Sequence, residues 1–302
     1  MREMTGPAID WKGIAVFLLI TFAITYSLEG GLMLIGISPI VRGVGQYLVL
    51  IAMWVPAFAT LVTAKFITRE GFGGLLLRFG DWREYVKVGL AIPAGFVLIY
   101  GLTWLLGLGQ PDWELRHFQG LFTAQGIEPP PIPSPFIIWP VLFFVSLLIG
   151  PIANSVIAFG EELGWRGYLL PKLMPLGKPK AYLLMGLIWG MWHWPLVLAG
   201  FMYPGNLFAG LIMFTTLTTV LGIYINELTL RQRSSILAGW AHGVFNTQRL
   251  GMWALLFPGF NPWLGGFSGL LGLAFWLLLG LWESRRARVS PAYLVADQTK
   301  SG

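Results

Sequence analysis

Two adjacent carboxylates, Glu161 and Glu162, end a long apolar run, and Arg166 follows them by about one helical turn. Residues four apart share a helical face, so Glu162 and Arg166 can form an ion pair. Glu161 lies about 100° round the helix from Glu162 and remains free to face a cavity. A carboxylate in an apolar segment is costly unless it meets a partner, which makes both residues functional candidates. We interpret Glu162 with Arg166 as structural support and Glu161 as the reactive group.

Two of the three histidines also lie in apolar runs. His193 follows an aromatic-rich stretch, and His242 stands four residues before Asn246, on the same helical face. Either histidine alone is equally typical of a hydrogen bond between helices. The third, His117, falls in a polar connection, where we expect it to be exposed to solvent.

A carboxylate, two imidazoles and a carboxamide around one wet pocket suit hydrolysis. Glu161 can act as a general base toward a water held against His193. His242 and Asn246 can donate hydrogen bonds to the oxyanion of a tetrahedral intermediate. Alternatively, Glu161, His193 and His242 can be ligands of Zn²⁺, whose bound water attacks, although the zinc-protease spacing His-Glu-x-x-His is absent. The residues leave both mechanisms open.

Three other polar residues occur within the apolar runs. Asn154 and Ser155 lie one to two turns before the glutamates and are candidates for lining the same cavity. Glu29 lies near the end of the first run, and we interpret it as a packing or interface residue.

The composition indicates what must position these residues. The chain has 302 residues, of which 56% are hydrophobic and 11% are charged, whereas a soluble domain carries about 25% charged residues. This balance predicts an integral membrane protein. Cysteine is absent, which excludes disulfides and thiolate metal sites. The net charge of +6 comes from basic residues at the ends of apolar runs, which favours membrane orientation over nucleic-acid binding.

Eight apolar runs approach the length of about 20 residues that a spanning helix needs. Their hydrophobicity is unbroken, which favours helices over the alternating strands of a barrel. We therefore predict an all-α, polytopic membrane protein with about eight transmembrane helices. The runs cover residues 14–37, 47–66, 86–108, 135–159, 181–198, 207–225, 236–257 and 263–282.

The basic residues predict the orientation of these helices. All 20 Lys and Arg residues except Arg42, Arg116 and Arg249 fall on the side that holds both termini. The positive-inside rule then places both termini in the cytoplasm of a multi-pass cell-membrane protein. Glu161, His193 and His242 lie roughly 10 to 20 Å from the helix ends on that side, at the rise of an α-helix. We therefore predict an active-site pocket in the inner half of the bilayer, open to the cytoplasm.

We divide the chain into three parts. Residues 1–135 would hold three membrane helices, an amphipathic cytoplasmic segment at 69–84 and a long outer loop. Residues 136–283 would form the catalytic core with the remaining five helices. Residues 284–302 are basic and then polar, which predicts a disordered cytoplasmic tail.

Three short motifs occur in order along the second part of the chain. They are Glu161-Glu162-x-x-x-Arg166, Trp189-x-x-x-His193 and His242-x-x-x-Asn246. Together they resemble those of the intramembrane CAAX-prenyl-protease-like endopeptidases, the CPBP or CAAX protease self-immunity family, which is related to the Ras-converting enzyme. The resemblance covers residues 142–257, and its one departure is Trp189, where the family more often has phenylalanine.

The resemblance implies cleavage of a peptide bond near the C-terminus of a substrate or within a membrane-associated protein, with Glu161 as the water-activating base. Members are often classed as metalloproteases, although the same residues also support a metal-free mechanism. The implied partners are the lipid bilayer and a peptide or lipidated protein, and not nucleic acid. The change from phenylalanine to Trp189 implies a different pocket width and unchanged chemistry.

Two other functions are compatible with these residues. In a non-catalytic bacteriocin-immunity or scaffold protein, the motif residues would only hold the helices together. In a proton-coupled transporter, buried Glu and His would relay protons. The transporter is disfavoured because the ionisable groups cluster on one side and do not form a path.

Overall fold

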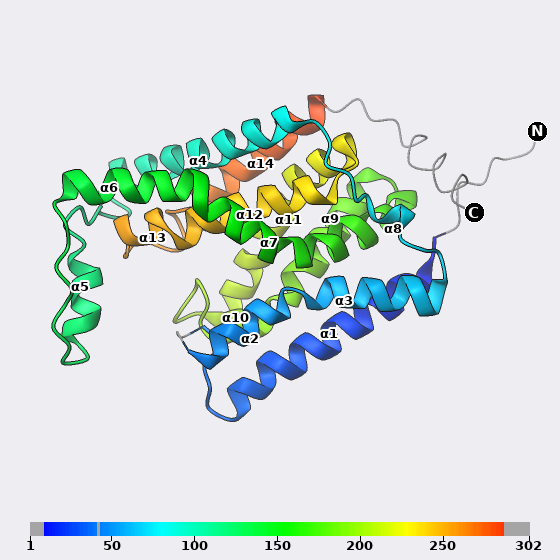
Figure 1. Ribbon diagram of the computed structural model, residues 1–302, viewed down its shortest axis with the longest axis horizontal. Coiled ribbons are helices and arrows are strands. Elements are labelled where there is room, and N and C mark those ends of the chain that lie inside the picture. The colour runs from blue at the N-terminus through cyan, green and yellow to red at the C-terminus, as the bar shows by residue number, and fades with distance from the viewer. Residues whose placement is uncertain (1–8, 41–42, 287–302) are drawn as a thin grey trace, which may run out of the picture.

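The computed structural model describes residues 9–40 and 43–286, and it is helical throughout this part of the chain (Figure 1). Its one extended pairing there is an isolated bridge between Gly109 and Phe260. The prediction of an all-α protein is therefore confirmed. The predicted disordered tail lies outside the described residues from 287 onward.

The helices before the candidate site are α1 (Trp11–Leu34), α2 (Val44–Ala52), α3 (Val55–Val62), η1 (Thr63–Thr68), η2 (Gly73–Leu75), α4 (Trp82–Leu105) and α5 (Arg116–Thr123). One long, nearly continuous helical stretch follows, made of α6 (Pro135–Phe144), η3 (Val145–Ile149), α7 (Gly150–Glu162), η4 (Leu163–Leu169), α8 (Leu170–Leu173) and η5 (Met174–Leu176). The chain continues with α9 (Lys178–Trp192), α10 (Trp194–Leu198), α11 (Leu207–Gln232), α12 (Ser235–Leu250), α13 (Met252–Leu256) and α14 (Leu270–Arg286).

Within the part of the chain that the structure describes, five helical segments are long and apolar enough to cross a membrane, which indicates a multi-pass membrane protein. They cover residues 11–34, 44–68, 82–105, 135–176 and 207–232. The other three predicted runs are also helical, but α9, α12 and α14 have only 15, 16 and 17 residues. A helix of that length rises about 22 to 26 Å, less than the roughly 30 Å of hydrocarbon. Eight crossings therefore stay a prediction.

The three short helices have clear structural limits. Gly177, with φ of 86°, begins α9, and His193 with the following Pro195 ends it. Gly251 interrupts the seventh predicted run after α12, and Gly266, with φ of 64°, lies in the turns before α14. Hydropathy alone did not reveal these breaks because the residues around them stay apolar.

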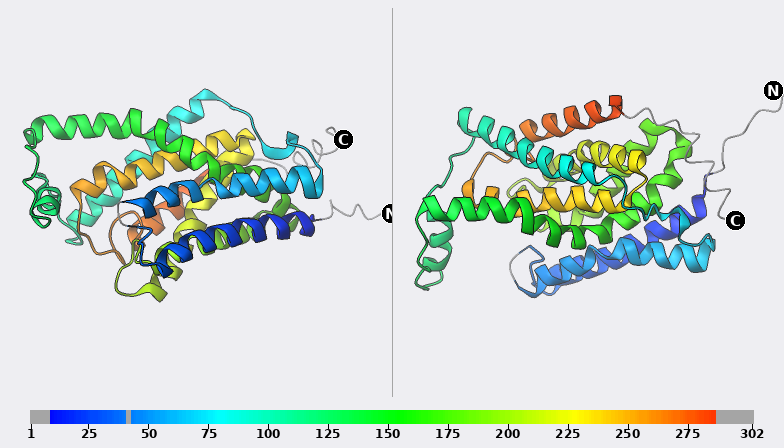
Figure 2. Two further views of the ribbon diagram at one scale, coloured as in Figure 1. Left: turned by 60° about the horizontal axis from the view of Figure 1, so that its bottom comes forward. Right: turned by 45° about the horizontal axis from the view of Figure 1, so that its top comes forward.

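The helices form layers in which α7, α9, α11 and α12 occupy the middle (Figure 1). On one side α1 packs against α2 and α3, and on the other side α4 and α14 cover α12 and α11 (Figure 2). The closest neighbours are α7 and α12. A Cβ at Gly243 would lie 2.3 Å from Ser155 Oγ, so only glycine permits this approach of the two helices. The next residue back, His242, is thereby brought beside the glutamates of α7.

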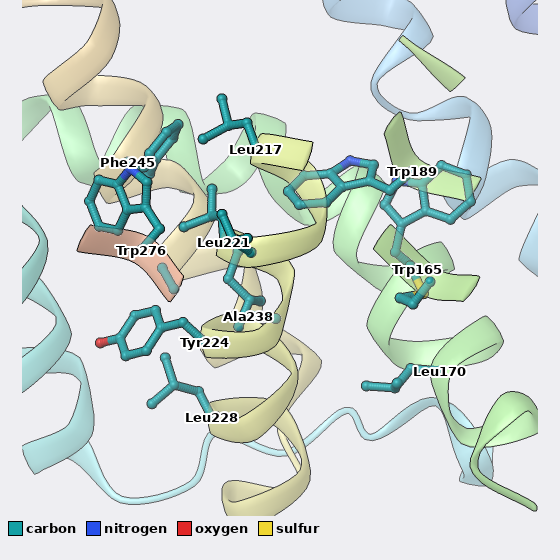
Figure 3. Packing of buried hydrophobic residues seen from close by; sticks show 14 of the residues in the cluster. Trp165, Leu170, Trp189, Leu217, Leu221, Tyr224, Leu228, Ala238, Phe245 and Trp276 are labelled. Carbon is teal, nitrogen blue, oxygen red and sulfur yellow. The ribbon is translucent and has the colours of Figure 1, made fainter. Parts of the chain in front are cut away.

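Large side chains fill the space between these helices. Trp165 and Trp276 are fully buried, and the ring of Phe245 packs edge-on against Trp276 at 5.3 Å between centroids. Leu217 and Leu221 of α11 lie between these aromatic groups, as Figure 3 shows. The core therefore fixes the helices on which the polar residues stand.

Ion pairs gather at the end of the bundle that carries most of the basic residues. Arg231 of α11 binds Glu84 of α4 at 2.6 Å and Glu283 of α14 at 2.7 Å. Lys172 binds Asp10, the N-cap of α1, at 2.7 Å. These contacts tie distant segments together at that end.

Two predicted connections differ from expectation only in detail. The segment 69–84 contains the short turn η2 and the first residues of α4, and it exposes the apolar side chains of Phe72, Phe79 and Trp82. The long connection 109–134 contains α5, which buries none of its residues, and His117 is exposed as predicted.

Candidate active site

The structure places the four predicted catalytic residues on one pocket. Its lining includes Glu161 of α7, His193 at the end of α9, and His242 and Asn246 of α12. Most of the remaining lining is apolar, and α2 and α11 supply several of its residues. Residues that lie up to 85 positions apart in the sequence, from 161 to 246, therefore converge on one cavity.

Glu161 lies in the last turn of α7, and only 1% of it is exposed. Its Oε2 accepts a hydrogen bond of 2.9 Å from Nε1 of Trp189. The helix changes to π geometry directly after Glu162, and such segments are frequent at functional sites. Glu161 is thus held by one indole and presented to the pocket.

Glu162 points away from the pocket and binds two partners through one oxygen. Its Oε1 accepts a 2.9 Å hydrogen bond from Arg166 Nη1, and both side chains are fully buried. The same Oε1 lies 2.8 Å from His242 Nδ1. The predicted pair is confirmed, but the sequence analysis missed that it also holds His242.

Arg166 is anchored on three sides. Besides Glu162, its Nε donates to Asn226 Oδ1 of α11 at 3.1 Å, and its guanidinium lies 4.2 Å from the centre of the Trp189 ring. One cation thus ties α7 and η4 to α9 and α11. No motif signals Asn226, which is a single amide in an apolar helix.

The hydrogen bonds of the two histidines show which ring nitrogen of each is available to a substrate or a water. His193 Nδ1 lies 2.9 Å from the carbonyl oxygen of Trp189, which only accepts, so Nδ1 carries the proton. His242 Nδ1 likewise faces the Glu162 carboxylate. In both rings Nε2 has no hydrogen-bond partner among residues 9–40 and 43–286. The two Nε2 atoms are therefore the nitrogens available to a substrate or a water.

Comparison with known proteins agrees with this geometry. The family model for Rce1-like type II CAAX prenyl endopeptidases matches residues 136–248, which contain all three motifs. This part of the chain is Rce1-like. It is also similar to CAAX prenyl protease 2 of Methanococcus maripaludis, with 28% identity over 199 residues, or 55% of this chain and 73% of that protein. The predicted family is confirmed, and the matched region begins in α6 and ends in α12.

Within this Rce1-like protein, the structure separates the two polar neighbours on α7. Asn154 lines the pocket and donates 3.0 Å hydrogen bonds to the Gly150 carbonyl and to Thr247 Oγ1. Ser155 does not line it, because its side chain faces Gly243 of α12 and donates to the Pro151 carbonyl. The prediction was right for Asn154 and wrong for Ser155.

Glu29 lines the same pocket, which corrects its interpretation as a packing or interface residue. Only 1% of Glu29 is exposed, and its Oε2 has no hydrogen-bond partner within the described chain. The signal was present in the sequence, because Thr21, Thr25 and Glu29 repeat every four residues and mark one buried polar face of α1.

Arg249 is a second pocket residue that the sequence analysis missed, having used it only to assign orientation. It follows Asn246 by three residues on α12, so both lie on one face of that helix. Its guanidinium stacks over the ring of Phe201 at 5.1 Å. The pocket of this Rce1-like protein thus contains one cation in addition to its two carboxyl groups.

The pocket lies near the middle of the bundle. Its lining includes residues from the first half of α11, from α2 and from the second half of α12, and no residue from 163 to 188. The depth of the pocket in the bilayer and its opening to the cytoplasm stay predictions.

The residues do not fit a zinc centre. Over the described residues, no three His, Cys, Asp or Glu side chains come together as metal ligands. The interpretation of Glu161, His193 and His242 as Zn²⁺ ligands therefore has no support in this geometry, and no step below uses a metal.

Proposed function

We propose that this Rce1-like protein is an intramembrane endopeptidase that hydrolyses a peptide bond in a membrane-associated or C-terminally hydrophobic substrate. The observation that carries the proposal is the convergence of Glu161, the two histidines and Asn246 on one largely apolar pocket. The apolar walls suit a hydrophobic or lipidated peptide. We also propose that the eight apolar segments all lie within the membrane and that both termini are cytoplasmic.

The reaction begins at Glu161. Its carboxylate removes a proton from a water that also donates to His193 Nε2, and the resulting hydroxide attacks the substrate carbonyl. The oxyanion that forms accepts hydrogen bonds from Asn246 Nδ2 and from Nε2 of His242, which donates when the ring is protonated. Glu161 then returns its proton to the leaving nitrogen, the C–N bond breaks, and an amine and a carboxylate are released.

Glu162 and Arg166 act through His242. The carboxylate of Glu162 holds Nδ1 of His242 and is compatible with a protonated ring, whose Nε2 then points a donor at the substrate. Arg166 fixes Glu162 in place through their buried ion pair. These residues position the catalytic groups without contacting the substrate.

The substrate class follows from the family and its relatives. A C-a-a-X sequence ends in a cysteine that can be prenylated, two aliphatic residues and a terminal residue. We infer that such a C-terminal segment, prenylated or equally apolar, is the substrate here. The family description and the relative named CAAX prenyl protease 2 support this inference.

The test is cleavage in reconstituted lipid vesicles. We expect the protein to release a C-terminal fragment from an S-farnesylated C-a-a-X peptide, detected by mass spectrometry, and His193→Ala and His242→Ala each to reduce the rate at least about 100-fold. A peptide without the farnesyl group tests whether the lipid is required. Equal rates for His193→Ala and the unchanged protein would remove the basis for the proposal.

Trp189 gives a second prediction, because its hydrogen bond corrects the view that it changes only pocket width. Trp189→Phe keeps an aromatic ring but deletes the N–H that holds Glu161 Oε2. We expect kcat to fall about tenfold, the usual effect of one hydrogen bond to a charged group, with KM nearly unchanged.

Trp192→Phe is the matched control for this prediction. Trp192 also lines the pocket, but its Nε1 donates to Thr25 Oγ1 at 2.9 Å and not to the base. Its effect on kcat should be clearly smaller. Equal losses in the two variants would show that the indole N–H of Trp189 has no special role.

A further inference from the structure

Arg249 continues the row of functional groups along α12. His242, Asn246 and Arg249 follow one another at intervals of four and three residues, so they share one helical face, and all three line the pocket. Arg249 lies about 4.5 Å beyond Asn246 and about 10 Å beyond His242 along the helix axis. A cation therefore stands just past the groups proposed to hold the oxyanion.

This cation differs from three other interior cations in forming no salt bridge. Arg166 binds Glu162, Arg231 binds two glutamates, and Lys178 binds Glu227. Within residues 9–40 and 43–286, Arg249 forms no salt bridge; it contacts the face of the Phe201 ring and interacts with the Glu161 carboxylate only across the pocket. A guanidinium between apolar walls is unfavourable in free energy when no anion is bound to it, so an anionic ligand would stabilise Arg249.

The charges of the pocket limit where an anionic ligand can bind. Glu161 and Glu29 line the pocket as well, and either carboxylate repels an anion. Arg249 is the one Lys or Arg side chain in the lining, so beyond the groups proposed to hold the oxyanion it is where a carboxylate is favoured over water. The fork of a guanidinium matches a carboxylate with two parallel hydrogen bonds, which a lysine does not reproduce.

We propose that Arg249 binds the free C-terminal carboxylate of the peptide being cleaved. The proposal rests on the proposed endopeptidase function and adds to it the residue that recognises the end of the substrate. An extended peptide advances about 3.3 Å per residue. The distance from the oxyanion groups to the reach of the Arg249 side chain therefore spans a few residues between the cleaved bond and the terminus. A chain that continues past this point would leave the guanidinium unpaired.

The experiment compares two peptides that differ only at the C-terminus, an S-farnesylated C-a-a-X peptide with a free carboxylate and the same peptide as its amide. We expect kcat/KM for the acid to exceed that for the amide by roughly ten- to a hundredfold, as for loss of a charged hydrogen bond. Arg249→Gln should cleave the two peptides with equal efficiency, and Arg249→Lys should retain part of the preference. Equal rates for acid and amide in the unchanged protein would overturn the proposal without any variant.

Arg116→Gln is the control for a general effect of charge. Arg116 is exposed in α5 and pairs with Glu114, outside the pocket, so its loss should leave the preference for the acid intact. A preference that falls equally in Arg116→Gln and Arg249→Gln would overturn the proposal, since the effect would then come from net charge.

Binding separates failure of this proposal from failure of the proposed function. The Glu161→Gln variant should bind the fluorescently labelled acid at least tenfold more tightly than the amide, with the difference lost on adding Arg249→Gln. If this holds but no peptide is cleaved, the carboxylate site stands and the endopeptidase proposal fails. If both peptides are cleaved at equal rates, the endopeptidase proposal stands and the proposed carboxylate site fails.

A lipid phosphate is the competing ligand of the same chemistry. The cleavage and binding measurements are therefore repeated in vesicles of neutral phosphatidylcholine and in vesicles with added anionic phosphatidylglycerol. A preference for the acid that is equal in both supports the peptide carboxylate. The proposal would be overturned if Arg249→Gln changed cleavage or binding only in vesicles with anionic lipid and the acid and the amide behaved alike.

Discussion

Glu161→Gln is expected to stop peptide cleavage while leaving the fold intact. In the proposed mechanism this carboxylate accepts a proton from water, and Gln cannot do so. General-base catalysis contributes about 10² to 10⁴-fold, so kcat should fall by at least about 10²-fold. The fold should survive because the amide oxygen of Gln still accepts the hydrogen bond from Trp189 Nε1. Single-turnover cleavage in vesicles measures the first effect, and thermal unfolding in detergent measures the second.

Retained cleavage in Glu161→Gln would place the base elsewhere. The pocket offers one other carboxyl, Glu29, whose Oε2 is unpaired. Glu29→Gln is therefore assayed in parallel. If Glu29→Gln is the inactive variant and Glu161→Gln is active, the roles assigned to the two carboxyl groups are reversed.

The sequence predicted the site better than it predicted the architecture. Spacing of four residues on a helix was enough to pair Glu162 with Arg166, because that geometry is local. Convergence of His193, His242 and Glu161 was also predicted, from hydropathy and depth together. The contacts that join different helices were not, since the bonds of Glu162 to His242 and of Arg166 to Asn226 depend on how the helices pack.

Errors in the architecture have a common physical origin. Hydropathy counts apolar residues and does not detect where a glycine or proline ends a helix, so α9, α12 and α14 are shorter than their apolar runs. Arg249 was missed because it is a single charge without a motif, and only packing shows that it faces the pocket. The repeat of Thr21, Thr25 and Glu29 marks a buried face of α1, but only packing shows that this face meets the pocket.

Glu162→Gln should produce the largest loss of stability, in contrast to the same change at its neighbour. The carboxylate is fully buried and is shared by Arg166 and His242. Removing its charge leaves the buried guanidinium of Arg166 without an anion, which costs about 3 to 5 kcal/mol. Activity should fall as well, because His242 loses the partner that fixes its ring. Thermal and denaturant-induced unfolding in detergent measure the free-energy change.

The matched comparison is Glu161→Gln, which removes a charge one residue away and should leave the midpoint of unfolding nearly unchanged. A double variant tests the cause. If the loss in Glu162→Gln comes from the unpaired Arg166, then adding Arg166→Met should recover part of it, since removing both members of a buried pair is far less costly than removing one. Equal stability of Glu161→Gln and Glu162→Gln, or no recovery in the double variant, would contradict the separation of a structural from a reactive glutamate.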